Sequence, residues 1–476
     1  MAKAVIKPSP LLIAAAACAA LAALSLLLPS APTYDPYAWL IWGRDLAHLD
    51  LVTRGTGTSW KPFPVLVDAL LAPLGRGQPD GWLVVARAGA LFACFMSYRL
   101  ARRIAGPGWG VLAGALAALS LLVSHDFFKR DVVGNAEGLA TGLGLLAIER
   151  HLDGRRGQAF ALGITAGLIR PEAWPFLVAY GCWLWFARVR PPRAATAAAG
   201  LLVPLLWLGG DWLGSGRVFG ASDQALQPIK NSAGSSPDPA LAVLREALTM
   251  LPGPARIGVP VALAWAVFGW FRRRRGPAAP NVGLVLVLGA GALAWTLVVA
   301  ALAARGYPGL PRFLFMAMGL AAVLGGVGAA LIGRAAVALA ERLRLRPVRR
   351  VAAACCVAAL AVSVVPDVTA LRADAADAET LADHDQGLAA AVGDAGGARG
   401  VFGCGAPVTS WYAVTALAYD LGVGAYRIHL EPSRRRPVVF LLGVEQRQLR
   451  ALRRGGLRLA DHVDGWQVLD RCPRST

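Results

Sequence analysis

The chain has 476 residues, of which 56% are hydrophobic and only 16% are charged, whereas a soluble domain carries about a quarter charged residues. This composition excludes an ordinary soluble protein and predicts an integral membrane protein. The formal net charge of +19 lies entirely before residue 366, because the tail from Pro366 onward holds equal numbers of basic and acidic residues. Such a distribution fits positively charged membrane loops and argues against nucleic acid as a partner.

Eleven apolar runs are long enough to be membrane spans, at about 20 residues for a straight helix and fewer for a helix buried in protein. They lie at 9–29, 81–101, 105–123, 135–149, 158–169, 172–187, 195–213, 256–271, 282–303, 313–333 and 351–365. The first run is longer than the apolar core of a usual signal peptide, so we expect it to stay as an anchor. The predicted fold class is an α-helical polytopic membrane protein with about 11 transmembrane helices.

Basic residues between the apolar runs predict the topology, because Lys and Arg gather in cytoplasmic loops. With the N-terminus in the cytoplasm, every inner loop is positive, including the segments 99–103, 272–275 and 334–350. Eleven spans then place the tail on the outer side, together with long loops at 30–80 and 214–255. The predicted location is therefore the plasma membrane, with a cytoplasmic N-terminus and an extracytoplasmic C-terminal domain.

One apolar stretch of thirty residues, 158–187, is interrupted by Arg170-Pro171-Glu172. Positive loops on both sides require the chain to reverse its direction within this stretch. Proline removes a backbone donor and restricts the residue before it, so it favours a break in the helix. We predict two short helices that meet at an outward tip.

The composition divides the chain into a membrane domain, 1–365, and a soluble domain, 366–476. In the second domain the patterns predict a helix at 373–392, a strand at 399–404, a helix near 409–421, a strand at 437–442 and a helix at 445–454. Alternating strands and helices predict a small α/β domain with a partly parallel sheet. This domain has too few acidic residues and histidines in constellations to indicate catalysis, which favours a packing or acceptor-binding role.

Seven cysteines are present, and five of them lie in apolar segments, where a free cysteine behaves as a small hydrophobic residue. Cys404 and Cys472 are the two in the polar tail. If the tail is extracytoplasmic, these two cysteines can pair as a disulfide; pairing and free thiols remain open alternatives.

Residues 34–64 form the first long loop and carry polar groups beside a membrane span, where ionised groups usually serve a role. Residues 36–50 place Trp39 and Trp42 at helical spacing, which predicts an amphipathic helix that lies at the headgroup level as an interfacial brace. Asp35 precedes this helix, and Lys61 follows the loop that returns from it. Asp35 either caps the helix or takes part in chemistry with Lys61.

These features resemble the first outer loop of the GT-C membrane glycosyltransferases, in particular the protein mannosyltransferase and aminoarabinose transferase type and the actinobacterial mannosyl- and arabinosyltransferases. Those enzymes carry an Asp-Glu pair, whereas this chain has Asp35-Pro36, so the second acid is missing. The resemblance continues in Gly167-Leu168-Ile169-Arg170-Pro171 and in Pro311-Arg312-Phe313-Leu314, and it covers about three quarters of the chain.

The resemblance implies that a sugar, mannose or arabinofuranose, passes with inversion from a polyprenyl-phosphate donor to an envelope glycan, glycolipid or protein on the outer face. Asp35 would be the general base. The implied donor-phosphate ligands are Lys61, Arg312, Arg170 and Arg87, and the implied acceptor or cavity residues are Tyr34, Trp60, Asp126, Asp131 and Glu172. A cofactor is not certain; Mg²⁺ or Mn²⁺ is an open alternative with His125 and Asp126 as weak ligand candidates.

Simpler roles remain open for several of these residues. Arg87 fits a side chain that extends to the membrane surface, and Glu172 fits an ion pair with Arg170. Asp126 and Asp131 fit local ion pairs with Lys129 and Arg130, which lie between them in the chain. For the whole chain, a transporter or flippase of lipid-linked sugars and a non-catalytic envelope assembly protein are the competing functions; no internal repeat supports a transporter.

Overall fold

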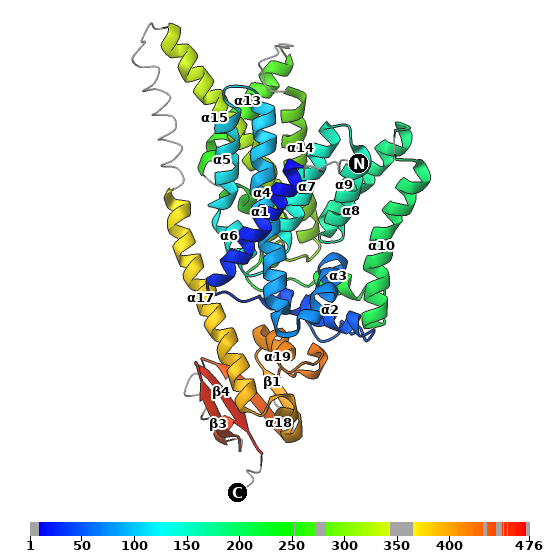
Figure 1. The fold of residues 1–476 in the computed structure, drawn as a ribbon, viewed down its shortest axis with the longest axis vertical. Coiled ribbons are helices and arrows are strands. Elements are labelled where there is room, and N and C mark those ends of the chain that lie inside the picture. The colour runs from blue at the N-terminus through cyan, green and yellow to red at the C-terminus, as the bar shows by residue number, and fades with distance from the viewer. Residues whose placement is uncertain are drawn as a thin grey trace, which may run out of the picture.

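The computed structural model describes residues 9–189, 191–251, 253–271, 282–342, 365–431, 436–443, 450, 452–454 and 456–472. Figure 1 shows a bundle of long helices with a small sheet beyond one end of it, reached through the long helix α17 (Val365–Asp394). The helix α2 (Tyr34–Ala47) lies between the bundle and the helix α19 (Val414–Asp420) of the sheet-bearing part. The fold thus places the first long loop at the junction of its two parts.

Ten of the eleven predicted spans coincide with helices, and the eleventh, 351–365, lies outside the described residues except for Val365. The ten helices are α1 (Pro10–Leu24), α4 (Gln78–Ala105), α5 (Gly110–Leu122), α7 (Glu137–Leu152), α8 (Arg156–Gly167), α9 (Trp174–Phe186), α10 (Arg193–Ser215), α13 (Gly253–Phe271), α14 (Val282–Ala303) and α15 (Phe315–Arg342). Within the described ranges, six helical segments are long and apolar enough to cross a membrane, or seven if one bent pair is a single span. The protein is therefore a multi-pass membrane protein, and the count of eleven stays a prediction.

Short elements connect these helices. They are η1 (Ser25–Leu27), α3 (Pro62–Leu71), η2 (Ala72–Gly77), α6 (His125–Val132), η3 (Pro171–Ala173), α11 (Gly220–Ala225), η4 (Ala233–Ser235), α12 (Pro239–Thr249) and η5 (Pro311–Leu314). The predicted long loops at 30–80 and 214–255 therefore contain helices of their own. The predicted reversal at Arg170 is confirmed, since Arg170 is extended (φ −135°, ψ 118°) and Pro171 opens the 3-10 turn before α9.

Small residues hold the centre of the bundle together. A Cβ atom on Gly328 of α15 would collide with the carbonyl oxygen of Gly258 on α13, so these two backbones are in direct contact. Close backbone approach through small residues is a main source of helix association in membranes, where the hydrophobic effect between helices is weak. The same helix α15 also packs against α4, α5, α7 and α14. A larger residue at Gly328 would force α13 and α15 apart.

The predicted helix at residues 36–50 is confirmed in the main, but the prediction that its tryptophans lie at the headgroup level is wrong. Residues 34–47 do form the helix α2, but Trp39 and Trp42 are fully buried. Trp39 meets Trp82 edge to face at 5.6 Å, and Trp42 packs against Trp60 at 6.1 Å. The apolar face of α2 is covered by α3 and α4 and not by lipid, because Gly43 lets the backbone of α3 approach at Asp68.

The C-terminal part is an α/β unit with a four-stranded sheet in the order β1-β2-β4-β3. Its elements are α17, α18 (Gly397–Cys404), β1 (Ala406–Thr409), η6 (Trp411–Ala413), α19, η7 (Ala425–Arg427), β2 (Pro437–Leu442), β3 (Arg458–Val463) and β4 (Trp466–Asp470). β1 and β2 are parallel, whereas β2, β4 and β3 pair antiparallel, so the predicted partly parallel sheet is confirmed. The boundary between domains at residue 365 stays a prediction.

The predicted helices at 373–392 and near 409–421 and the strand at 437–442 are confirmed. The predicted strand at 399–404 is wrong, because these residues form α18 and the strand that pairs with β2 begins only at Ala406. The predicted helix at 445–454 lies mostly outside the described residues. The β3–β4 hairpin was not predicted, although its Asp464-Gly465 turn, with φ of 44° and 80°, is a strong hairpin signal.

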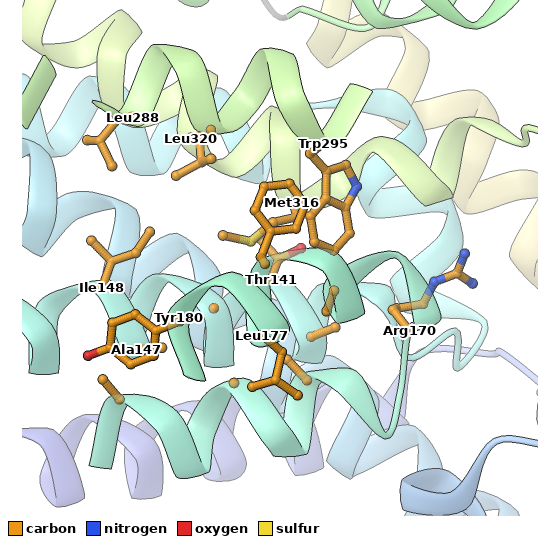
Figure 2. Close-up of a pocket in the computed structure, with 18 of the residues that line it drawn as sticks. Thr141, Ala147, Ile148, Arg170, Leu177, Tyr180, Leu288, Trp295, Met316 and Leu320 are labelled. Atoms are coloured by element: carbon orange, nitrogen blue, oxygen red, sulfur yellow. The ribbon is translucent and has the colours of Figure 1, made fainter. Parts of the chain in front are cut away.

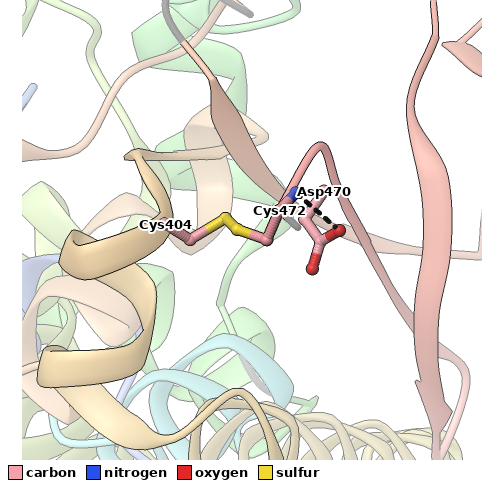
Figure 3. Close-up of side chains that lie close together, drawn as sticks. All are labelled: Cys404, Asp470 and Cys472. Carbon is pink, nitrogen blue, oxygen red and sulfur yellow. Dashed lines mark hydrogen bonds between the residues drawn. A yellow bond between two sulfur atoms is a disulfide. The ribbon is translucent and has the colours of Figure 1, made fainter. Parts of the chain in front are cut away.

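Cys404 and Cys472 form a disulfide with their Cα atoms 5.5 Å apart, within the normal range for such a bond. It ties the end of α18 to the segment after β4 (Figure 3). Asp470 lies beside the two sulfur atoms, and its carboxylate accepts a hydrogen bond from the backbone N–H of Cys472 at 3.2 Å. The disulfide removes the two thiolates that a metal ion would need there.

Polar contacts join the C-terminal part to α2. The hydroxyl of Tyr37 lies 2.7 and 2.8 Å from the two carboxylate oxygens of Asp385, and the hydroxyl of Thr415 donates to the carbonyl oxygen of Tyr34 at 3.0 Å. Arg44 donates to the carbonyl oxygen of Val423 at 3.0 Å. The start of α2 is therefore held from the membrane side and from the C-terminal side at once.

This junction predicts a pH dependence of stability. Burial, together with the nearby carboxylate of Asp385, raises the pKa of Asp420 from 3.8 to about 8. Because the folded protein binds this proton more tightly than the unfolded chain, stability falls as pH rises from about 4 to about 8. We expect Asp420→Asn to raise the Tm in detergent at pH 9 by roughly a few °C and to change it little at pH 4. Asp383→Asn, at an exposed position on α17, is the matched control; an equal shift at both pH values would contradict this assignment.

Candidate active site

Four of the predicted site residues meet in one place, although they come from distant parts of the chain. Asp35 lies in the first turn of α2, Lys61 precedes α3, Arg170 precedes η3 and Arg312 lies in η5. In each of the last three cases a proline follows or precedes the charged residue and starts a helical turn, so the backbone there is well defined. We call Lys61, Arg170 and Arg312 the cation cluster.

Asp35 does not cap α2, because the N-cap position is Thr33 and the carboxylate of Asp35 bonds elsewhere. One oxygen accepts a hydrogen bond from the hydroxyl of Thr58 at 2.8 Å, and the other accepts from the guanidinium of Arg312 at 2.5 Å. Burial alone would raise the pKa of Asp35, but Arg312, Lys61 and Thr58 outweigh it and lower the pKa from 3.8 to about 2. Asp35 is therefore ionised at any physiological pH.

Glu137, at the start of α7, is the acid around which the cation cluster assembles. Its Oε1 atom lies 3.5 Å from Lys61 Nζ, 2.9 Å from Arg170 and 3.9 Å from Arg312. Its Oε2 atom is buried without a hydrogen-bond partner. Glu137 was not predicted as a site residue, although an ionisable side chain near the start of the apolar run 135–149 is a signal for one.

Arg170 is fixed by a second acid and a tyrosine. It forms a two-pronged ion pair with Glu172 and donates a hydrogen bond to the hydroxyl of Tyr307 at 2.9 Å, and this hydroxyl donates to Glu172 at 2.8 Å. The guanidinium also lies 4.1 Å from the ring centre of Phe313. Glu172 therefore acts as the ion-pair partner of Arg170, as the simpler interpretation proposed. Such a fully paired, buried arginine is rigid.

The exposed fractions of the side chains divide the site into a buried interior and a partly exposed edge. The side chains of Lys61, Glu137, Arg170 and Glu172 are at most 4% exposed, whereas those of Arg312 and Asp35 are 14% and 19% exposed. Burial lowers the pKa of Lys61 from 10.5 to about 8, although the nearby carboxylate of Glu137 opposes this shift. The ion pair of Arg312 with Asp35 is thus the part of the site that an entering molecule meets.

An apolar groove of about 740 Å³ leads away from the cation cluster. It runs between α7, α8, α9, α14 and α15, with Arg170 at one end and Tyr180 and Ala147 toward the other (Figure 2). Glu137, Arg170 and Arg312 are its charged lining at the near end; Leu177, Leu288 and Met316 are among its apolar walls. At the far end the ring nitrogen Nδ1 of His151 lies 2.9 Å from the hydroxyl of Tyr180. The groove is suited to a long apolar chain with a charged head.

Other predicted site residues have structural contacts. The guanidinium of Arg87 bonds to the backbone oxygen of Val132 and to Ser25 and Ser30, so it joins α1 to α6 and is not part of the cation cluster. Asp131 accepts a hydrogen bond from the backbone N–H of Gly138 at 3.2 Å and so supports the start of α7. Both residues stabilise elements that carry the site.

The two aromatic candidates lie at the edge of the site. The indole N–H of Trp60 donates to the carbonyl oxygen of Leu206 at 3.1 Å, which anchors Lys61 to α10. The hydroxyl of Tyr34 accepts a hydrogen bond from the backbone N–H of Gly57 at 3.0 Å. This bond fixes the loop that carries Thr58, the partner of Asp35. The side chain of His125 lies outside the described residues.

The residues at the site do not fit a divalent cation. Asp35, Glu137 and Glu172 each pair with an arginine, whose positive charge would repel a divalent cation from these carboxylates. Among the described side chains, the group with metal-like spacing is Cys404, Asp470 and Cys472, in which the two sulfur atoms are joined. Asp126 does not belong to this group.

Crystal structures of ArnT from Cupriavidus metallidurans resemble nearly the whole chain. The form bound to undecaprenyl phosphate has a TM-score of 0.57 at 14% sequence identity, and the apo form has a TM-score of 0.59 at 15% identity; each covers 96% of this chain and 97% of ArnT. At this identity the likeness shows the fold alone: the chain has the fold of ArnT, which confirms the predicted α-helical polytopic membrane fold, whereas the count of about 11 helices stays a prediction. No family model matches the sequence, and no curated protein matches it.

Proposed function

We propose that this protein with the GT-C fold is a membrane glycosyltransferase that transfers a sugar from a polyprenyl-phosphate donor to a hydroxyl group at the outer face of the membrane. One observation carries the proposal: an apolar groove of about 740 Å³ opens onto a cation cluster, and the carboxylate of Asp35 lies beside that cluster. A polyprenyl phosphate has the matching parts, a long apolar chain and an anionic head. The likeness to an ArnT structure bound to undecaprenyl phosphate supports this class of donor.

The cation cluster suits the donor phosphate for two reasons. Arginine presents paired donors that match phosphate oxygens, and a buried cation in a water-poor site attracts an anion strongly. Arg312 lies at the open edge in a partly exposed ion pair with Asp35, whereas Arg170 is buried and paired with Glu172 and Tyr307. Arg312 and Lys61 are therefore the proposed direct phosphate ligands, and Arg170 keeps Glu137 and the cluster in position.

The proposed reaction is a single displacement with inversion. The acceptor oxygen forms a bond to the anomeric carbon while the bond from that carbon to the phosphate oxygen breaks, and the polyprenyl phosphate leaves with the electron pair. The proton of the acceptor hydroxyl passes to Asp35. General base catalysis of this kind contributes about 10²–10⁴-fold in rate. Lys61 and Arg312 stabilise the additional negative charge on the leaving phosphate.

The ion pair of Arg312 with Asp35 couples donor binding to the activity of the base. With Arg312 at 2.5 Å, the pKa of Asp35 is about 2, which makes its carboxylate a weak base. A donor phosphate competes with Asp35 for the guanidinium of Arg312, and loss of that contact raises the pKa of Asp35. Asp35 is thus a stronger base when the donor is bound, that is, when a sugar is present to be transferred.

In the enzymes that the sequence resembles, a second acid follows the aspartate of the first loop, whereas Pro36 stands at that position here. We propose that Glu137 serves as the second acid of this site. It neutralises part of the charge of Lys61, Arg170 and Arg312, and without it three cations would lie together in a buried site. Because Glu137 on α7 neutralises part of this charge, Asp35 at the open edge is not the sole counter-ion of the cation cluster. This arrangement favours a catalytic role over a non-catalytic assembly protein.

Mannose and arabinofuranose remain the expected sugars, and an envelope glycan, glycolipid or protein remains the expected acceptor. The test is a transfer assay in proteoliposomes with the full chain and radiolabelled polyprenyl-phosphate mannose or polyprenyl-phosphate arabinofuranose, with total membrane extract as the acceptor. We expect label to move from one of these donors to an acceptor. Movement of the intact labelled lipid between leaflets without transfer would instead support the flippase.

Filling the groove tests the lipid part of the donor. A Cβ atom on Gly291 of α14 would meet only the side chain of Leu320, at 3.5 Å, so Gly291→Leu places its side chain in the groove without a backbone clash. We expect the KM for a long-chain polyprenyl donor to rise about tenfold or more, because several CH₂ groups lose their apolar contacts. A donor with a short prenyl chain should be affected much less.

Gly209→Leu on α10 is the matched control for this prediction, because nothing lies within 4 Å of a Cβ atom there and Gly209 does not line the groove. It should leave both KM values unchanged. Equal effects of Gly291→Leu on the long and the short donor would argue against the groove as the lipid site.

A further inference from the structure

An exposed aromatic patch lies on the C-terminal part near the start of α2. It consists of Trp411, Tyr412 and Tyr426, which are 68%, 42% and 50% exposed. The rings of Trp411 and Tyr412 meet edge to face at 6.1 Å. Exposed aromatic side chains that cluster in this way usually mark a binding surface, since water is a poor environment for them.

The aromatic patch is joined directly to the residue next to Asp35. The ring of Trp411 lies 6.3 Å from that of Tyr34, and the backbone of Tyr34 is held by the hydroxyl of Thr415, four residues after Trp411. Tyr34 precedes Asp35 in the first turn of α2. An occupant of the patch would therefore lie beside Tyr34, the residue that directly precedes the proposed base.

The loop that positions Asp35 also supports the patch from the other side. Gly55 packs so closely on the backbone of Tyr426 that a Cβ atom at Gly55 would collide with it. Three residues later, Thr58 donates its hydrogen bond to Asp35, and Gly57 donates to Tyr34. Loop 55–58 thus connects the aromatic patch with the carboxylate through short backbone segments. The aromatic patch and the site around Asp35 are therefore supported by the same loop.

The chemistry of the patch fits a carbohydrate. One face of a pyranose or furanose ring carries C–H groups that stack on an aromatic face, while the hydroxyl groups at its edge stay in water. Trp411 is two-thirds exposed and offers an aromatic face for the C–H groups, and the exposed tyrosines Tyr412 and Tyr426 carry hydroxyl groups that can bond to sugar hydroxyls. The membrane surface fits less well, because the patch belongs to the C-terminal part: η6 leads directly into α19, and α2 lies between α19 and the bundle of membrane helices (Figure 1).

We propose that the aromatic patch of Trp411, Tyr412 and Tyr426 binds a sugar ring of the acceptor, so that the acceptor is a glycan or glycolipid. This inference rests on the proposed function, which requires an acceptor hydroxyl at Asp35. It gives the C-terminal part a role: it supplies an acceptor subsite beside the catalytic carboxylate. Trp411 is a binding residue here and takes no part in the chemical step.

The test uses the full chain in nanodiscs and measures binding without turnover. Saturation-transfer difference NMR with α-mannotriose and with an arabinofuranose oligosaccharide as probes should give ring-proton signals for the wild type, and Trp411→Ala should abolish them. In the transfer assay, Trp411→Ala should raise the acceptor KM about tenfold or more and leave the donor KM unchanged. Trp411→Phe should recover most of the binding, since it restores an aromatic face.

Trp212→Ala is the matched control, because Trp212 is 57% exposed on α10 and belongs neither to the patch nor to the site. Unchanged saturation-transfer signals in Trp411→Ala would overturn the proposal even if sugar transfer persists. Brominated lipids quench the fluorescence of tryptophans that contact the bilayer. If Trp411→Ala shows less of this quenching than the wild type, Trp411 lies in the membrane, and the proposal is overturned. If the probes bind at Trp411 but the protein transfers no sugar, the aromatic patch is a sugar-binding site and the proposed glycosyltransferase activity is wrong.

Discussion

Asp35→Asn is expected to lower the rate of sugar transfer by about 10²–10⁴-fold while the protein is still made, inserted and able to bind the donor. Asparagine is nearly the same size as aspartate and can still accept the hydrogen bond from Thr58 that the carboxylate accepts at 2.8 Å. It cannot accept a proton from the acceptor hydroxyl. The loss should therefore fall on kcat, whereas the donor KM should stay the same or decrease, because Arg312 is released from its ion pair with Asp35.

Asp45→Asn is the matched control, since Asp45 lies on the same helix and pairs with Arg44 at 3.4 Å, away from the cation cluster. It should transfer sugar at the wild-type rate. Donor affinity is measured separately, by competition with unlabelled polyprenyl phosphate, so that a folding defect is distinguished from a catalytic one. If Asp35→Asn transferred sugar at the wild-type rate, Asp35 would not be the general base. The cation cluster would then still be a proposed phosphate-binding site.

The sequence predicted the parts of the site that carry their own local signal. Asp35, Arg170 and Arg312 stand near the ends of apolar runs, and Lys61, Arg170 and Arg312 each lie next to a proline that starts a helical turn. In an apolar chain such charged residues are costly, so they are few and easily recognised. Their meeting place could be inferred because the predicted topology put all four at the same face.

Glu137, Thr58 and Tyr307 were missed because their roles exist only in three dimensions. Glu137 meets partners that are 76, 33 and 175 residues away in the sequence, and no spacing rule relates positions so far apart. For the tryptophans of α2 the error was different, because a position was predicted for them and the structure contradicts it. An amphipathic pattern reports that one face is apolar, but it does not report whether lipid or protein covers that face, and here α3 and α4 do.

The largest effect on donor recognition is expected from Arg312→Gln. Arg312 joins Asp35, Asn135 and Glu137, and it is the member of the cation cluster with the most exposed side chain. Removing one charged donor at a site where negative charge develops costs about 10²–10³-fold. We expect kcat/KM for the donor to fall by at least this factor, through both a higher KM and a lower kcat, because Arg312 is proposed to contact the phosphate before and during its departure.

Arg312→Gln also changes the pH dependence, and this separates its electrostatic role from a packing role. The guanidinium of Arg312 is a main cause of the low pKa of Asp35, about 2, so its loss raises that pKa. Since the base must be ionised, the acid limb of the kcat/KM profile, which reports free enzyme, should move to higher pH. Arg312→Lys should keep this limb near its original position because it retains the charge.

Arg305→Gln is the control, at an exposed arginine in the same connection between α14 and η5. The cluster should stay folded in Arg312→Gln, because Glu137 keeps its contacts with Lys61 and Arg170. An unshifted acid limb together with a large loss of kcat/KM would mean that Arg312 acts on the donor without controlling Asp35. In that case the coupling between donor binding and the base, which follows from their 2.5 Å contact, would be wrong while the phosphate site would remain.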